Sequence, residues 1–194
     1  MKIIEVIKHS AELLGLQDTL EVLNTATEEN EEDILMNVDV RKLLSLSALS
    51  IQEMCSNYIS VYAEQEIETE DCKFALNKLK NYIRLAGVYE NDQMLKFKVI
   101  NRNVILEKDG KFTVRYCSYP DIESLFCEID FLSNFNPDVL VMALCSYYAI
   151  AHGMFMEFDA FHEKYIEKAQ TLKDLKLFEL PVRRWEWTLK NQYI

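Results

Sequence analysis

The sequence predicts an α+β protein in which a helical bundle carries an inserted antiparallel β domain of about five strands. Apolar residues recur at helical spacing near both ends of the 194-residue chain, whereas apolar and polar residues alternate in its middle. The two helical parts must pack together because neither can bury its apolar stripe alone. We therefore divide the chain into a helical bundle at 1–71 and 120–175, a β domain at 72–119 and a C-terminal docking tail at 176–194.

The amino-terminal part is predicted to form two short helices and one long helix. Ile3, Ile7, Ala11 and Leu14 define the first apolar stripe, and Gly15 follows as a helix stop. Glutamate and aspartate gather before and after the long helix, where they are typical of solvated connections. The predicted helices cover 2–14, 18–23 and 34–62, and the acidic stretches cover 27–33 and 64–71.

In the middle of the chain the apolar period changes to two, which indicates strands with one solvated face. Leu95, Phe97 and Val99 alternate with lysines, and a second alternating run follows Lys108-Asp109-Gly110-Lys111. Asp-Gly supplies the positive φ angles of a tight turn, so a β-hairpin is predicted there. Further turns are expected at Asn91-Asp92 and at Asn101-Arg102-Asn103. The predicted strands lie near 72–76, 81–89, 93–99, 103–107 and 111–118, in an antiparallel meander.

After Pro120 the helical period returns. Asn136-Pro137-Asp138 is typical of a helix start, and 139–151 is apolar on every side, so a central buried helix is expected. Gly153 ends that helix, and the stripe from Phe155 to Leu172 predicts one more amphipathic helix. The chain closes on an extended or irregular tail.

Charge divides the chain into two parts. The net charge is −11, which disfavours DNA or an anionic membrane as the main ligand. Residues 72–119 contain ten basic and four acidic residues, so they carry +6 and the remainder carries −17. The basic residues could simply keep a sheet face solvated, bind nucleic acid, or meet the acidic helices of a neighbouring copy. The third interpretation predicts an inter-subunit basic face of Lys96, Lys98, Arg102, Lys111 and Arg115.

The sequence offers little material for catalysis, so we expect no enzyme, cofactor or metal site. None of the five cysteines forms a C-x-x-C pair, and no phosphate-binding or nucleophile motif occurs. Cys145 precedes His152 on one helical face, and His162 follows Asp159, but the apolar surroundings favour core packing over a nucleophile pair or a metal site. No signal peptide is expected, and the longest apolar run is too short to span a bilayer.

The arrangement resembles the head-to-tail connector (adaptor) proteins of tailed bacteriophages and prophages over nearly the whole chain. The resemblance rests on the opening helix, the long helix with Leu43-Leu44-Ser45-Leu46, the lysine-rich β segment with Val114-Arg115-Tyr116, and the helical pair with Tyr147-Tyr148-Ala149-Ile150-Ala151-His152-Gly153. Its most characteristic piece is Leu180-Pro181-Val182-Arg183-Arg184-Trp185 after the last helix.

The resemblance implies a ring of copies, commonly twelve, that sits beneath the portal at the capsid vertex and extends the DNA channel toward the tail. It implies as partners the portal protein, tail or neck proteins and further copies of the chain, with DNA passing without specific binding. It places the protein in the virion neck after assembly in the bacterial cytoplasm. A short tail at 183–194 is expected here in place of the long C-terminal extension by which some relatives grip the portal. A different non-enzymatic neck, tail-completion or chaperone protein is the alternative.

On this interpretation the tail is a partner-binding element. Arginine and tryptophan dominate the binding energy of protein interfaces. The predicted contact residues are Arg183, Arg184, Trp185 and Trp187. The alternative is that Trp185 covers the end of the bundle and Arg183 pairs with a surface carboxylate.

Overall fold

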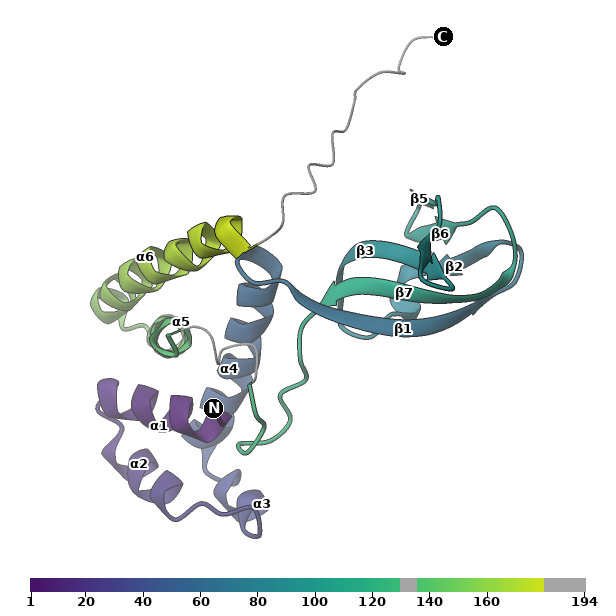
Figure 1. Cartoon of the computed structure of the whole chain (residues 1–194). Helices are drawn as coiled ribbons and strands as arrows, with labels where there is room; N and C mark the ends of the chain where they lie inside the picture. The colour runs from purple at the N-terminus through teal and green to yellow at the C-terminus, as the bar shows by residue number, and fades with distance from the viewer. Residues whose placement is uncertain (130–135, 180–194) are drawn as a thin grey trace.

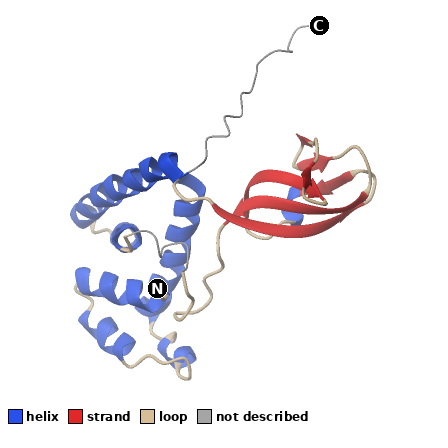
Figure 2. Cartoon of the chain, in the orientation of Figure 1, coloured by secondary structure: helices blue, strands red, loops and turns tan. Residues whose placement is uncertain are grey.

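The chain consists of a helical body and a projecting β unit, which confirms the α+β class. The structure is a computed structural model that describes residues 1–129 and 136–179. Figure 2 shows the helices gathered in one body, with the strands extending from its side. We call residues 61–118 the β arm and the rest of the described chain the helical body.

The amino-terminal half of the helical body contains four helices, and the long helix predicted at 34–62 is shorter at both ends, running from Val38 to Asn57. The side chain of Asn37 accepts hydrogen bonds from the backbone N–H groups of Asp39 and Val40, at 3.0 and 3.2 Å. This cap starts a new helix and interrupts the predicted run from 34 to 62. The helices are α1 (Ile3–Leu13), α2 (Gln17–Asn24), α3 (Glu31–Ile34) and α4 (Val38–Asn57).

The carboxy-terminal half contains α5 (Asp138–Ala151) and α6 (Phe155–Glu179). Figure 1 shows α5 end-on, surrounded by α1, α4 and α6. Nine of its residues are buried, which confirms the predicted central helix. The Asn136 side chain accepts a hydrogen bond from the Asp138 N–H at 3.0 Å, so it caps this helix as the sequence predicted.

The β arm contains seven strands in two sheets rather than the five predicted. The four-stranded sheet has the order β1-β7-β3-β4 and the three-stranded sheet has the order β2-β6-β5. Only β3–β4 and β5–β6 pair with their neighbours in the sequence, so the predicted meander is wrong. The strands are β1 (Val61–Thr69), β2 (Lys73–Ala75), β3 (Tyr82–Glu90), β4 (Gln93–Met94), β5 (Lys98–Ile100), β6 (Asn103–Ile105) and β7 (Gly110–Ser118), with a short 3-10 turn at Leu76–Lys78.

The first strand, β1, lies in the segment that the sequence analysis assigned to the end of a helix and an acidic connection. It pairs antiparallel with β7 over nine residues. Ile67 and Thr69 are buried in the arm, while the intervening glutamates are exposed. The acidic residues therefore form the solvated face of a strand. The β arm begins at Val61, eleven residues before the predicted boundary at 72.

Two of the three predicted turns form two-residue hairpins. Asn91-Asp92 and Asn101-Arg102 all adopt positive φ angles, between +48° and +63°, as a type I′ hairpin requires. The hairpin predicted at Asp109-Gly110 is wrong, because β6 and β7 lie in different sheets. Asp109 instead accepts a hydrogen bond from the Cys72 N–H at 2.5 Å and so ties the two sheets together.

The two sheets of the arm face each other across a core that is separate from that of the body. Ile67, Phe74, Val88, Val104 and Phe112 are buried in it. Since the inner faces of the two sheets share this core, their outer faces point away from each other.

The root of the arm is tied to the segment that leads back into the helical body. The Asp121 carboxylate is 2.5 Å from both Lys80 Nζ and Asn81 Nδ2, and Asn81 also donates to the Tyr119 carbonyl at 3.1 Å. These bonds join the β2–β3 connection to the chain that leaves β7. They give the arm a fixed attachment from which it projects (Figure 1).

Candidate protein-docking surfaces

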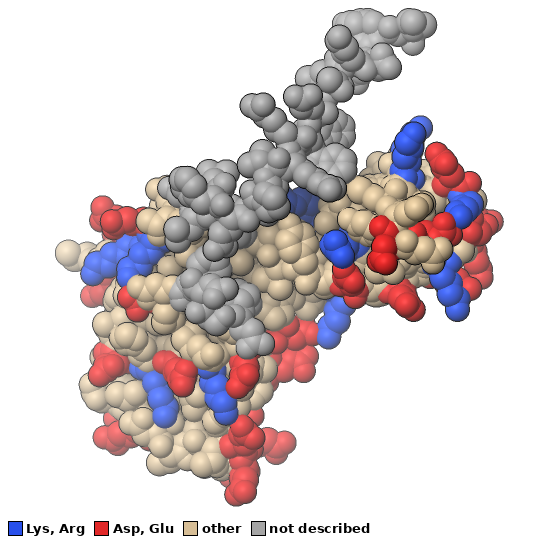
Figure 3. Space-filling view, in the orientation of Figure 1, with Lys and Arg blue, Asp and Glu red and all other residues tan. Residues whose placement is uncertain are grey.

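The charge of the β arm is nearly balanced once β1 is included. Residues 61–118 contain ten basic and nine acidic residues, so the arm carries +1 and the remaining chain carries −12. The predicted value of +6 came from a boundary that excluded five acidic residues at 64–71. Figure 3 shows the consequence, with blue and red side chains interleaved over the arm. The body remains acidic, but the arm as a whole is not its electrostatic opposite.

On the outer face of the four-stranded sheet, basic residues meet acidic residues of the same chain. Arg115 lies opposite Glu64 in the register, and its Nη2 and Nε are 2.5 and 2.7 Å from the same carboxylate oxygen. The Arg115 guanidinium also lies over the Tyr89 ring, 5.0 Å from its centroid. Lys111 is paired in the register with Glu68. Two of the five predicted basic-face residues thus lie beside glutamates of β1.

The other three predicted residues lie at the three-stranded sheet. Lys98 belongs to β5, Lys96 precedes it, and Arg102 occupies the hairpin between β5 and β6. All three are exposed, and none forms an ion pair with a residue that the structure describes. The five residues therefore do not form one face, because they divide between the outer faces of two sheets.

The outer face of the three-stranded sheet also carries isoleucines that the sequence analysis missed. The register aligns Lys73, Ile105 and Lys98 in one row across the sheet. Ile100, two residues from Lys98 and on the same face, is 50% exposed, and Ile105 is 37% exposed. The available signal was the pair of apolar residues that directly precedes the turn at Asn101. We call Lys96, Lys98, Ile100, Arg102 and Ile105 the arm tip.

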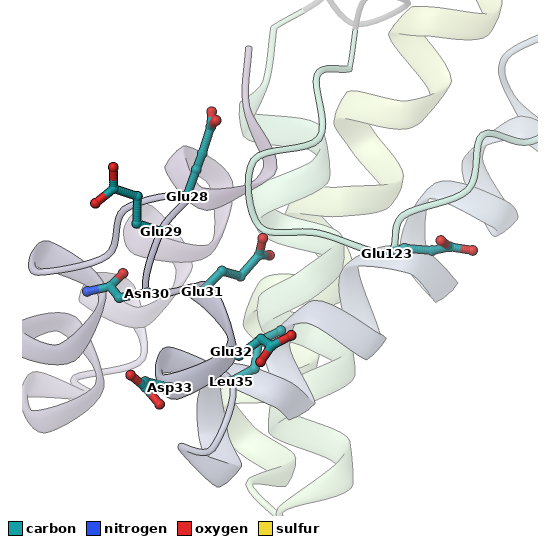
Figure 4. A pocket seen from close by; sticks show the side chains of 8 residues that line it. All are labelled: Glu28, Glu29, Asn30, Glu31, Glu32, Asp33, Leu35 and Glu123. Atoms are coloured by element: carbon teal, nitrogen blue, oxygen red, sulfur yellow. The ribbon is translucent and has the colours of Figure 1, made fainter.

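A second polar surface lies on the helical body, around α3 and the connection that precedes it. A pocket of about 460 Å³ opens there, and Figure 4 shows the residues that line it. Most of them are acidic, and the set comprises Glu28, Glu29, Asn30, Glu31, Glu32, Asp33, Leu35 and Glu123. We call this set the acidic pocket.

Two carboxylates of the acidic pocket have partners within the chain. Glu31 accepts hydrogen bonds from the Leu125 N–H at 2.6 Å and the Ser124 hydroxyl at 2.9 Å, so it holds the 120–129 segment against α3. Glu28 forms an ion pair with Lys2 at 3.3 Å. The remaining carboxylates form no ion pair with any residue of the described ranges; they are Glu29, Glu32, Asp33 and Glu123.

The geometry of the acidic pocket does not resemble a metal site. Its carboxylates point away from one another instead of converging (Figure 4). Among the described residues, no group of three or more His, Cys, Asp or Glu side chains is placed to hold a metal ion. Free carboxylates that diverge in this way are suited to an extended cationic surface rather than to a single ion.

The Cys145 and His152 side chains, which the sequence placed on one helical face, take separate partners. The Cys145 thiol is buried between α1 and α5, 3.8 Å from the Ser10 carbonyl oxygen, and burial raises its pKa to about 12. The His152 ring stacks on Tyr148 with 4.1 Å between centroids. His162 stacks on Phe158 at 5.0 Å. A buried thiol with a raised pKa is a poor nucleophile at neutral pH.

No family model matches the sequence, and a search of curated proteins finds no similar protein. Within 1–129 and 136–179, no helix has the length and apolar character needed to cross a membrane.

The predicted docking tail is only partly described. Helix α6 extends to Glu179, so the first four residues of the segment 176–194 are helical. The four predicted contact residues lie outside the described residues; they are Arg183, Arg184, Trp185 and Trp187.

Proposed function

We propose that this chain is a non-enzymatic structural subunit of a bacteriophage head-to-tail connector, which assembles into a ring under the portal and extends the DNA channel toward the tail. The observation that carries the proposal is the projecting β arm (Figure 1), whose three-stranded sheet presents exposed isoleucines and cations that form no ion pair with a described residue. A subunit that carries a contact surface on a projecting arm can reach a neighbour. When that neighbour is contacted through a different surface, the repeated contact closes into a ring.

The distribution of charge supports this role. The residues outside the arm carry −12, so the wall that helical bodies would form around a channel repels phosphate. An acidic wall does not neutralise DNA phosphates, so no counterions are released from the DNA and it is not bound there. An acidic body therefore suits a conduit better than a site that grips nucleic acid.

The experiment that tests the proposal is to find the protein in the particle. Phage particles from a strain that encodes the chain are labelled with a gold-tagged antibody against it and imaged by electron cryo-microscopy. We expect label at one capsid vertex per particle, together with ring-shaped density between the capsid and the tail. Label spread over the capsid or along the tail, or particles that contain none of the chain, would contradict the proposal.

A further inference from the structure

We propose that the arm tip docks onto the acidic pocket of a second copy of this chain. The inference rests on the proposed function, since both require the protein to associate with itself. It specifies which surface each copy contributes and which surface it receives.

The arm tip has the composition of an interface. Ile100 and Ile105 lie on the solvent side of their sheet, with lysines on both flanks of Ile105. Lysine alone would be expected on an edge strand that is protected from pairing. Protection against strand pairing does not explain the exposed isoleucines beside it. Apolar surface that stays in water costs about 25 cal/mol per Å² in free energy.

The other outer face of the arm provides an internal comparison. There Arg115 forms an ion pair with Glu64, and Lys111 lies opposite Glu68 in the register, so both basic residues have acidic neighbours in the same chain. At the arm tip, Lys98 and Arg102 have no such partner among the described residues. The cations of the arm tip therefore differ from Arg115, whose charge is paired within the chain.

The acidic pocket offers the complementary combination. Glu29, Glu32 and Glu123 are exposed carboxylates that form no ion pair within 1–129 and 136–179, and they would meet the cations of the arm tip. Leu35 lines the same pocket, and the adjoining Met36 is 79% exposed. Apolar and charged groups thus occur together on both surfaces, with the charges opposite in sign.

The partner must be a second copy rather than the same chain. In Figure 1 the arm leaves one end of α4 and α3 lies at the other end, so the arm tip does not reach the acidic pocket of its own chain. Because the two surfaces differ, one copy can dock its arm tip on a neighbour while its acidic pocket binds the arm tip of another copy. Such a head-to-tail contact repeats around a ring, and its opposite potentials select the register.

The test reverses the charges of each surface in turn and then mixes the two variants. Self-association of the full-length chain is measured by sedimentation velocity at two salt concentrations. Reversing the tip with Lys96→Glu and Lys98→Glu should weaken self-association at least tenfold. A second variant, with Glu29→Lys and Glu123→Lys, should weaken self-association to the same extent. An equimolar mixture of the two variants should associate more strongly than either alone, because each supplies the charges that the other lacks. Both altered positions of the second variant lie in connections, so no helix is disturbed.

The control is Lys111→Glu, which reverses the charge of one lysine on the opposite face of the arm and should leave association within twofold. Circular dichroism checks that each variant is folded. If the wild-type chain associates and the tip variant associates equally well, the inference is overturned while the proposed function stands. A weakened tip variant that the exchanged partner does not rescue overturns the choice of the acidic pocket. A wild-type chain that stays monomeric at every concentration overturns the inference, whereas the absence of label at a capsid vertex overturns the proposed function.

Discussion

The helical body and the β arm are built on cores of different size and continuity. In the described residues the body buries twenty-six hydrophobic side chains in one cluster, whereas the arm buries ten in a second cluster. The body joins helices from both halves of the chain, while the arm is a single continuous segment. A unit of this size is near the lower limit at which one core stabilises a domain. The comparison indicates that the arm is the less stable part and relies on its attachment to the body.

The largest effect is expected from Phe112→Ala in the arm. Phe112 is 2% exposed at the centre of the arm core, and truncation of a buried phenylalanine costs about 3–5 kcal/mol. Hydrogen exchange should accelerate throughout 61–118 while the amides of α5 stay protected. Tyr62→Ala, at a position 55% exposed on β1, is the control and should change little. Equal loss of protection in α5 would show that the two cores form one cooperative unit.

A slightly smaller effect is expected from Leu140→Ala in the body. Leu140 is fully buried in the central helix, so the cavity should cost about 3 kcal/mol in the free energy of unfolding. The measurement is urea denaturation followed by circular dichroism at 222 nm, where the helices dominate the signal. Ile150 on the same helix is 43% exposed, so Ile150→Ala should lower the free energy of unfolding by under about 1 kcal/mol. Similar costs at the two positions would contradict the central placement of α5.

The same comparison explains which parts of the fold the sequence predicted. The buried helix at 139–151 was found because its apolar character is local and continuous. The strand β1 was missed because glutamate at every second position resembles a solvated connection unless its partner is known. That partner, β7, lies more than forty residues away, so the pairing depends on contacts that no local pattern contains.

The candidate site was predicted in part for the same reason. Lys96, Lys98 and Arg102 were identified from composition, and at the arm tip they form no ion pair with the part of the chain that the structure describes. Lys111 and Arg115 were grouped with them, although β1 brings glutamates beside both. The isoleucines of the tip were missed because burial of an alternating strand cannot be assigned before the register is known. Sequence identified the charges, while topology determined which of them remain available.

A moderate effect is expected at the cap that separates α3 from α4. The Asn37 side chain satisfies two backbone N–H groups, so Asn37→Ala should destabilise the body by about 1 kcal/mol. Thermal unfolding should show the decrease, and Asn37→Asp should retain most of the stability. Asn24→Ala serves as the control, because Asn24 is exposed at the end of α2. No change in the Asn37→Ala variant would mean that packing alone fixes the start of α4.

The smallest effect concerns the attachment between the two regions. Hydrogen bonds from Lys80 and then Asn81 lower the pKa of the Asp121 carboxyl below its ordinary value of about 3.9. A carboxyl whose pKa is lowered in the folded state adds stability above its unfolded pKa. That contribution disappears as the pH falls through the folded value. The wild type should therefore exceed Asp121→Asn in urea midpoint at pH 6, and the difference should shrink to zero as the pH falls well below 4. Asp92→Asn, at an exposed turn on the arm, is the control for replacing an aspartate by an asparagine. A constant gap between wild type and Asp121→Asn at all pH values would mean that the shape of the side chain, and not its charge, holds the arm to the body.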